Sequence, residues 1–238
     1  MENNKHFYLA IDSDILRTLA YLDMLKKEYG VVDRSKIRDY GLRENLNYYI
    51  RLYNCVKYDE IRLLIVDAVY QESKHSEHLI NFIKEYCYFP NINAVNYQEK
   101  AEKARKLAYA YISDYEYEGE TCKRPMKSVF IADINKYVPT NDCYIMAQAT
   151  IEKCSLLTGN GQDFVFNKRN EDKDDHDRVR GIVRINILNN YYDEAENGHK
   201  IAPAPILIYT LGSILKGGAS GFETNEQTDD KVKADKVL

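Results

Sequence analysis

The sequence has no tryptophan, no C-x-x-C pair and no long apolar run, and each absence narrows the class of protein. Its five cysteines are an odd number, so we expect reduced, mostly buried thiols in a cytoplasmic protein rather than a disulfide framework. No stretch reaches the roughly 18–20 apolar residues needed to cross a bilayer. The N-terminal MENNKHF does not read as a signal peptide. We therefore expect no membrane association.

The chain also lacks a strong charge of either sign, with a formal net charge of −4 over 238 residues. Such a molecule does not coat nucleic acid, so any RNA must bind along a local basic strip, and salt must weaken that binding. The first candidates for phosphate contact are four cations spread along the chain: Arg17, Lys123, Arg124 and Lys168.

What the sequence does contain is an alternation of apolar runs with strand length and longer stretches with helical periodicity. The predicted strands are Phe7–Ile11, Ile61–Val66, Asn93–Tyr97, Ser155–Thr158 and Asp163–Phe166. The predicted helices are Ile15–Glu28, about Lys36–Val56, Val69–Tyr86, Glu99–Tyr115 and Asp142–Lys153. This order predicts an α/β fold with three α/β/α layers around a central, mostly parallel sheet.

The predicted elements group into one main domain over residues 1–167, with a long polar loop near 116–139 that contains a short element near Val129–Ile134. Residues 168–216 have apolar runs after a charge-dense loop, so we expect a C-terminal extension packed on or beside that domain. Residues 217–238 begin with GGASG and then lack apolar periodicity, which predicts a flexible tail.

Polar side chains recur where the predicted strands end. Asp12 follows the first strand, Glu72 begins the helix after the second, and Asp142 opens the helix that leads into SLLT. Asn160 and Asp163 follow SLLT directly. Because the carboxyl ends of parallel strands meet at one edge of a sheet, we expect these side chains to converge there.

Several acids in one pocket repel one another unless a cation neutralises them. An oxygen-rich site with open positions suits Mg²⁺ or Mn²⁺, and such an ion can activate water for attack on a phosphodiester. The residues therefore favour a divalent-metal phosphodiesterase.

Four segments in order resemble the PIN-domain nucleases: Asp12-Ser13-Asp14 after an apolar strand, Val69 to Glu72, Asn141 to Ala149, and Leu156 to Phe164. The resemblance covers about residues 5–167. It implies a PIN-like fold and a metal-dependent ribonuclease, often the toxin of a toxin–antitoxin pair. Its partners would then be an RNA substrate and an antitoxin-like protein inhibitor; a homodimer stays open.

The resemblance implies that Asp12, Glu72 and Asp142 are catalytic metal ligands. The fourth family position is often Asp but is Asn160 here, a neutral oxygen donor, and Asp163 is the candidate that would supply the missing charge. Asp14, Ser13 and Thr158 fill supporting positions. The expected reaction is cleavage of single-stranded or loop RNA by a metal-activated water.

Other interpretations of the same residues stay open. Asp12, Ser13 and Asp14 are all good helix caps, and capping alone explains one of them. Asp12 and Asp14 also fit the D-x-D motif of a haloacid-dehalogenase-like phosphatase, although Ile15-Leu16 replaces the usual following residues and Glu72 is left without a role. A third interpretation is a catalytically inactive nuclease-like module that binds RNA or protein.

Overall fold

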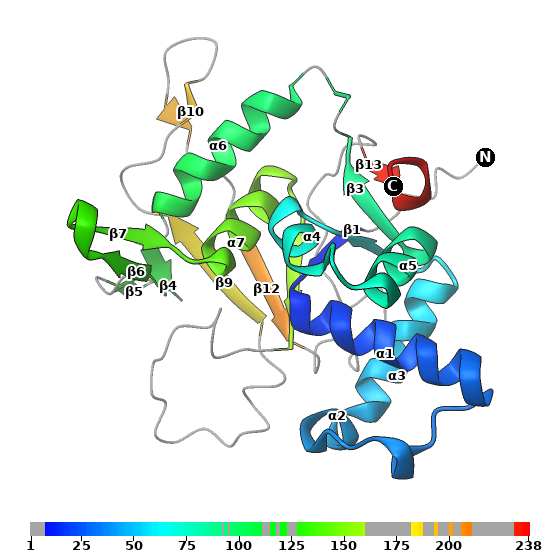
Figure 1. Ribbon diagram of the computed structural model, residues 1–238. Helices are drawn as coiled ribbons and strands as arrows, with labels where there is room; N and C mark the ends of the chain where they lie inside the picture. The colour runs from blue at the N-terminus through cyan, green and yellow to red at the C-terminus, as the bar shows by residue number, and fades with distance from the viewer. Residues whose placement is uncertain are drawn as a thin grey trace.

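The computed structural model describes residues 8–91, 93–94, 96–110, 115–117, 120–122, 128–159, 182–187, 193–194, 200–201, 206–210 and 231–238. At its centre five parallel strands lie in the order β3, β2, β1, β8 and β12 (Figure 1). Their bounds are Cys87–Pro90, Arg62–Leu64, Tyr8–Ile11, Ser155–Thr158 and Ile206–Thr210 respectively. All four residues of the middle strand β1 are buried, as expected for a strand covered on both faces.

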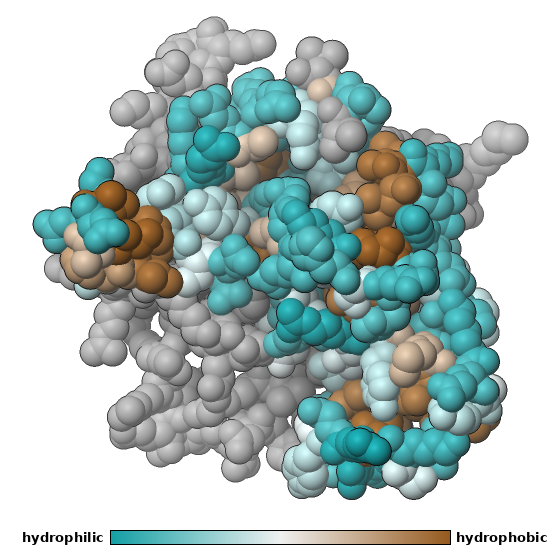
Figure 2. All heavy atoms as spheres, viewed as in Figure 1, coloured by the Kyte–Doolittle hydropathy of each residue, from teal (hydrophilic) through white to brown (hydrophobic). Residues whose placement is uncertain are grey.

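Antiparallel strands extend this sheet at both ends. β13 (Lys231–Lys233) pairs with β3, while β9 (Ile182–Ile187) pairs with β12 and leads on to β4 (Tyr115–Tyr117) and β5 (Glu120–Cys122). Two small sheets stand apart: β6 (Ser128–Ile131) with β7 (Lys136–Pro139), and β10 (Asp193–Glu194) with β11 (Lys200–Ile201). Apolar residues gather at the surface over the β6–β7 sheet (Figure 2).

Helices flank the sheet. They are α1 (Ser13–Tyr29), α2 (Tyr40–Glu44), α3 (Leu46–Lys57), α4 (Asp67–Ser73), α5 (Glu77–Tyr86), α6 (Tyr97–Ala110) and α7 (Asn141–Ile151), with 3-10 turns η1 (Arg34–Lys36), η2 (Ala132–Ile134) and η4 (Ala234–Lys236). α1 packs on α3 and α5, and α7 packs on α6 and α4. Within the described ranges no helix is long and apolar enough to cross a membrane. The predicted α/β class with a mostly parallel sheet is confirmed.

Local sequence explains the first helix well. Asp12 caps its start, and Gly30 ends it with φ 75°, a left-handed backbone conformation that glycine adopts without strain. Ile15, Leu19 and Leu22 form the predicted apolar stripe and are buried in the core.

Two helices expected to be continuous are broken. In place of one helix over 36–56, Asp39 starts α2 by accepting the amide of Leu42 at 2.6 Å, and Asn45 ends α2 and begins α3. In place of one helix over 69–86, Ser76 adopts an extended conformation that separates α4 from α5. At the first break the side chain of Asp39 caps the new helix, whereas Ser76 at the second break makes no side-chain capping hydrogen bond.

The strand predicted at Asn93–Tyr97 is wrong. The strand is Cys87–Pro90, which pairs with β2, and α6 already begins at Tyr97. The stretch 116–139, expected as a long loop, contains β6 and β7 in its second half, as well as β5. Residues 163–166, expected as a strand, lie outside the described residues.

The last eight residues differ from the expected flexible tail. β13 adds an antiparallel strand at β3, and Ala234 is fully buried. The side chain of Lys231 has no solvent exposure, and its Nζ lies 2.8 Å from Oε2 of Glu152. An ion pair and a strand ladder therefore order a segment that has little apolar periodicity of its own. β9 and β12, from the expected extension 168–216, continue the central sheet itself.

Candidate functional site

Asp12 directly follows strand β1 and lies at the carboxyl edge of the sheet, where its side chain is almost fully buried. Its Oδ1 accepts the amide of Ile15 at 2.8 Å, and its Oδ2 accepts the hydroxyl of Thr158 at the end of the neighbouring strand β8. Burial raises the pKa of the Asp12 carboxyl to about 6, against the opposing effect of these two donors. The edge of the sheet thus holds a carboxylate that is poorly solvated when charged.

Glu72 lies beside this group in the last turn of α4. Its Oε2 accepts the hydroxyl of Ser13, the residue next to Asp12, and its Oε1 accepts Nδ2 of Asn141 at 2.7 Å. These two contacts join the starts of α1 and α7 to the end of α4. Three segments that are far apart in the sequence therefore meet at one acid.

Asp142 follows Asn141 in the first turn of α7 and is half-buried. Since α7 starts where Asn141 reaches Glu72, Asp142 belongs to the same edge of the molecule as Asp12 and Glu72. The helix N-terminus also provides a favourable field for its charge. The three acids predicted from the sequence are thus carried by elements that converge.

A cation lies at the rim of this acid cluster. Nη2 of Arg17 is 4.0 Å from Oε2 of Glu72, and its Nη1 is 3.2 Å from Oδ1 of Asp14. Both Arg17 and Asp14 are more than half exposed. Asp14 therefore lies on the solvent side of the cluster, whereas Asp12 lies inside it.

The chemistry of the donors fits a hard divalent cation, because they are carboxylate, hydroxyl and amide oxygens. Each oxygen of Asp12 and Glu72 accepts at least one hydrogen bond, which fixes the orientation of both carboxylates. Among the residues that the structure describes, no three carboxylate, histidine or cysteine groups are close enough to hold a metal ion. Asp12, Glu72 and Asp142 would hold one only with a small rearrangement or with further ligands.

Five of the residues predicted for the site lie outside the described residues: Asn160, Asp163, Lys123, Arg124 and Lys168. Their expected roles stay predictions. The described chain reaches Gly159, directly after Thr158.

Two residues at this edge were not assigned a role from the sequence. Asn141 was part of the N-D motif, but the contact that its amide makes with Glu72 depends on how α7 and α4 pack. Tyr49, from α3, is buried behind the cluster, and its Oη lies 3.0 Å from where a Cβ on Gly159 would stand. Burial, together with the charges of Asp12 and Asp14, raises the pKa of Tyr49 to about 12.

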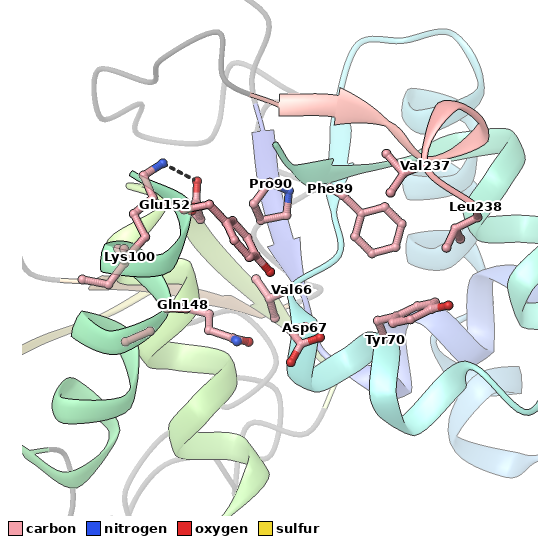
Figure 3. Close-up of a pocket in the computed structure, with 14 residues that line it drawn as sticks. Val66, Asp67, Tyr70, Phe89, Pro90, Lys100, Gln148, Glu152, Val237 and Leu238 are labelled. Atoms are coloured by element: carbon pink, nitrogen blue, oxygen red, sulfur yellow. Dashed lines mark hydrogen bonds and ion pairs between the residues drawn. The ribbon is translucent and has the colours of Figure 1, made fainter. Parts of the chain in front are cut away.

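A separate cavity of about 210 Å³ lies beside β3, between α4, α6, α7 and the C-terminal segment (Figure 3). Val66, Tyr70, Phe89 and Leu238 are among the apolar side chains that line it. None of the acids of the sheet edge lines it, so it is distinct from the candidate site.

Comparison of the chain with protein-family models, with curated proteins and with solved structures gives no match. The interpretation of the site therefore depends on its own residues and geometry.

Proposed function

We propose that this chain is a PIN-like, divalent-metal-dependent endoribonuclease that cleaves single-stranded or loop RNA. The observation that carries the proposal is a pair of hydrogen bonds at the carboxyl edge of a parallel sheet. Glu72 accepts one from Ser13, the neighbour of Asp12, and one from Asn141, the neighbour of Asp142. Acids from three distant segments of a chain repel one another when they are close together, unless a cation neutralises them. A flexible RNA strand suits a narrow acidic groove better than a duplex does.

Each side chain has a role in the proposal. Asp12, Glu72 and Asp142 would hold Mg²⁺ or Mn²⁺, while Thr158 and the Ile15 amide fix the orientation of Asp12. Ser13 and Asn141 orient the two oxygens of Glu72. When bound, the ion supplies an activated water and stabilises the charge that develops on the phosphate.

Arg17 has the position of a substrate-contacting residue. Its guanidinium is half-exposed beside Glu72, where the planar fork of donors matches a phosphate. The proposal includes a cytoplasmic location and an antitoxin-like protein inhibitor that would cover this acidic edge. Asn160 and Asp163 are proposed as the remaining ligands.

The experiment is cleavage of end-labelled single-stranded and hairpin RNA by the purified chain with Mn²⁺, with Mg²⁺ and with EDTA. We expect metal-dependent internal cleavage that Asp12→Asn and Glu72→Gln each reduce by at least about a hundredfold. Glu77→Gln is the matched control, an acid at the start of the next helix that makes no contact with the cluster among those described. Circular dichroism establishes that each variant is folded.

Other outcomes would point to the alternative functions. RNA binding without cleavage under any metal condition would favour the inactive binding module. Turnover of an aryl phosphate through a covalent phosphate on Asp12 would favour the phosphatase. Either result contradicts the nuclease proposal.

A further inference from the structure

The strands β6 and β7 and the turn η2 between them form a hairpin arm, Ser128–Pro139, at the left end of the molecule in Figure 1. The two strands form a sheet of their own, and β7 also contacts α6 and α7. Val129 pairs with Val138 and Phe130 with Tyr137 across the two antiparallel strands. In the part of the chain that the structure describes, the two strands pair only with each other. The arm therefore presents strand edges as well as faces.

The arm carries five exposed large apolar residues. Their relative exposure runs from 36% to 56%, and they are Val129, Phe130, Ile131, Ile134 and Tyr137. Figure 2 shows a brown, hydrophobic area over the β6–β7 sheet at the left end of the molecule. Single exposed apolar residues, such as Tyr40 and Tyr58 elsewhere on the surface, are ordinary, but five within ten residues form a patch.

The patch covers both faces of the arm. Side chains alternate along a strand, so Val129 and Ile131 point to one face and Phe130 to the other. Tyr137 faces the same way as Phe130, and their ring centroids are 5.1 Å apart. A hairpin that packed on its own domain would have one apolar and one polar face. Among the described residues, apolar side chains are thus exposed on both faces of the arm, as is typical of a surface that binds a partner.

We propose that the arm is a self-association surface that docks on the arm of a second copy of this chain about a two-fold axis. In such an interface the same patch occurs on both partners, so the patch must complement itself. The arm satisfies this requirement, because its charged residues are one acid, Asp133, and one base, Lys136. Its outer strand edges, which pair with no other described strand, can also continue the two-stranded sheet from one copy into the other.

RNA fits the arm less well than a second copy does. Three of the five exposed residues are the aliphatic Val129, Ile131 and Ile134, which offer no ring for a base to stack on. Lys136 is the single cation of the arm's sequence, so little attracts phosphate. The composition therefore matches the apolar centre of a protein interface.

Self-association would also affect the position of a residue in the candidate site, although the inference does not depend on the proposed function. β7 ends at Pro139, and the chain runs through Thr140 directly to Asn141, whose amide contacts Glu72. A partner that holds β7 in place would therefore also hold the start of α7.

The test is sedimentation velocity of the full chain over a range from micromolar to sub-millimolar concentration. We expect a dimer of twice 27.7 kDa for the wild type. Phe130→Glu and Ile134→Glu, which place like charges across the two-fold axis, should each weaken the dimer by at least about tenfold in dissociation constant. Tyr58→Glu, which changes an exposed ring away from the arm, should leave the dimer intact.

A charge-swap experiment tests whether opposite charges on the two arms restore the dimer. Mixing Phe130→Glu with Phe130→Lys should restore a dimer that neither variant forms alone. If Phe130→Glu fails to fold by circular dichroism, Ile134→Glu in the turn decides the question. A wild type that stays monomeric throughout, or a dimer unaffected by the folded arm variants, would overturn the proposal, as would loss of RNA binding with no change in mass.

Discussion

Nδ2 of Asn141 lies 2.7 Å from Oε1 of Glu72 and ties the first turn of α7 to the last turn of α4. Neither residue is near the other in the sequence, and both sit at the edge where Asp12 ends β1. The hydrogen bond leaves Glu72 with one orientation, because its other oxygen is held by Ser13. Asn141 is therefore a positioning residue of the candidate site.

Asn141→Ala should lower metal-dependent RNA cleavage by about ten- to a hundredfold, the usual effect of removing a group that orients a metal ligand. The Mn²⁺ concentration needed for half-maximal rate should rise in parallel. Asn141→Gln, which keeps the amide, should recover part of the loss. If Asn141→Ala cleaves RNA at the wild-type rate and needs no more Mn²⁺ than the wild type, Asn141 does not position Glu72 for metal binding.

The buried carboxyl of Asp12 predicts an unusual dependence of stability on pH in metal-free buffer. Its pKa is raised from 3.8 to about 6, so between these values the folded state holds more protons than the unfolded state. The free energy of unfolding should therefore fall as pH rises through this window, by up to about 3 kcal/mol, and this contribution should level off above it.

Urea unfolding of the wild type and of Asp12→Asn, measured with EDTA from acid to neutral pH, checks this prediction. Asp12→Asn should gain stability relative to the wild type as pH rises through the window. Asp133→Asn, an exposed acid, is the control and should follow the wild type. A constant difference between Asp12→Asn and the wild type at all pH values would contradict the assignment.

Thr158→Val keeps the shape of the side chain but removes the hydroxyl that donates to Asp12. Because a buried charge loses a donor, stability at neutral pH should fall by about 1–3 kcal/mol, and the pKa of Asp12 should rise further. Thr150→Val is the matched control, since Thr150 is also buried but bonds to the carbonyl of Met146 within α7. In a urea titration Thr150→Val should lose less stability than Thr158→Val.

Lys231→Met should destabilise the protein by about 2–4 kcal/mol, because it leaves the carboxylate of Glu152 buried with a weaker set of partners. Lys100, at 3.2 Å and partly exposed, compensates only in part. The double variant Lys231→Met/Glu152→Gln should recover much of the loss. If the single and double variants unfold at the same denaturant concentration, the pair does not hold the C-terminal segment in place.

The sequence predicted those parts of the fold that local periodicity determines. β1, α1, α7 and β8 lie where their apolar patterns place them, and the rule that parallel strands end at one edge brought Asp12 and Glu72 together. The carboxylates could be found because each follows an apolar run.

Features that depend on distant contacts could not be predicted in this way. β13 has a short, lysine-rich sequence, and its order comes from the free edge of β3 and from Glu152. The break at Ser76 and the contact between Asn141 and Glu72 depend on how α4, α5 and α7 pack. Within 116–139 the sequence predicted a short element near Val129–Ile134, where β6 and η2 lie, but not its pairing with β7, because the strands are short and polar residues surround them.

The central claim is that the acids at this sheet edge bind a divalent cation, and calorimetric titration of Mn²⁺ into the metal-free protein tests it most directly. We expect saturable binding that Asp12→Asn and Glu72→Gln each abolish, whereas Glu77→Gln binds as the wild type does. Absence of Mn²⁺ binding by the folded wild type, or undiminished binding by both site variants, would contradict the claim.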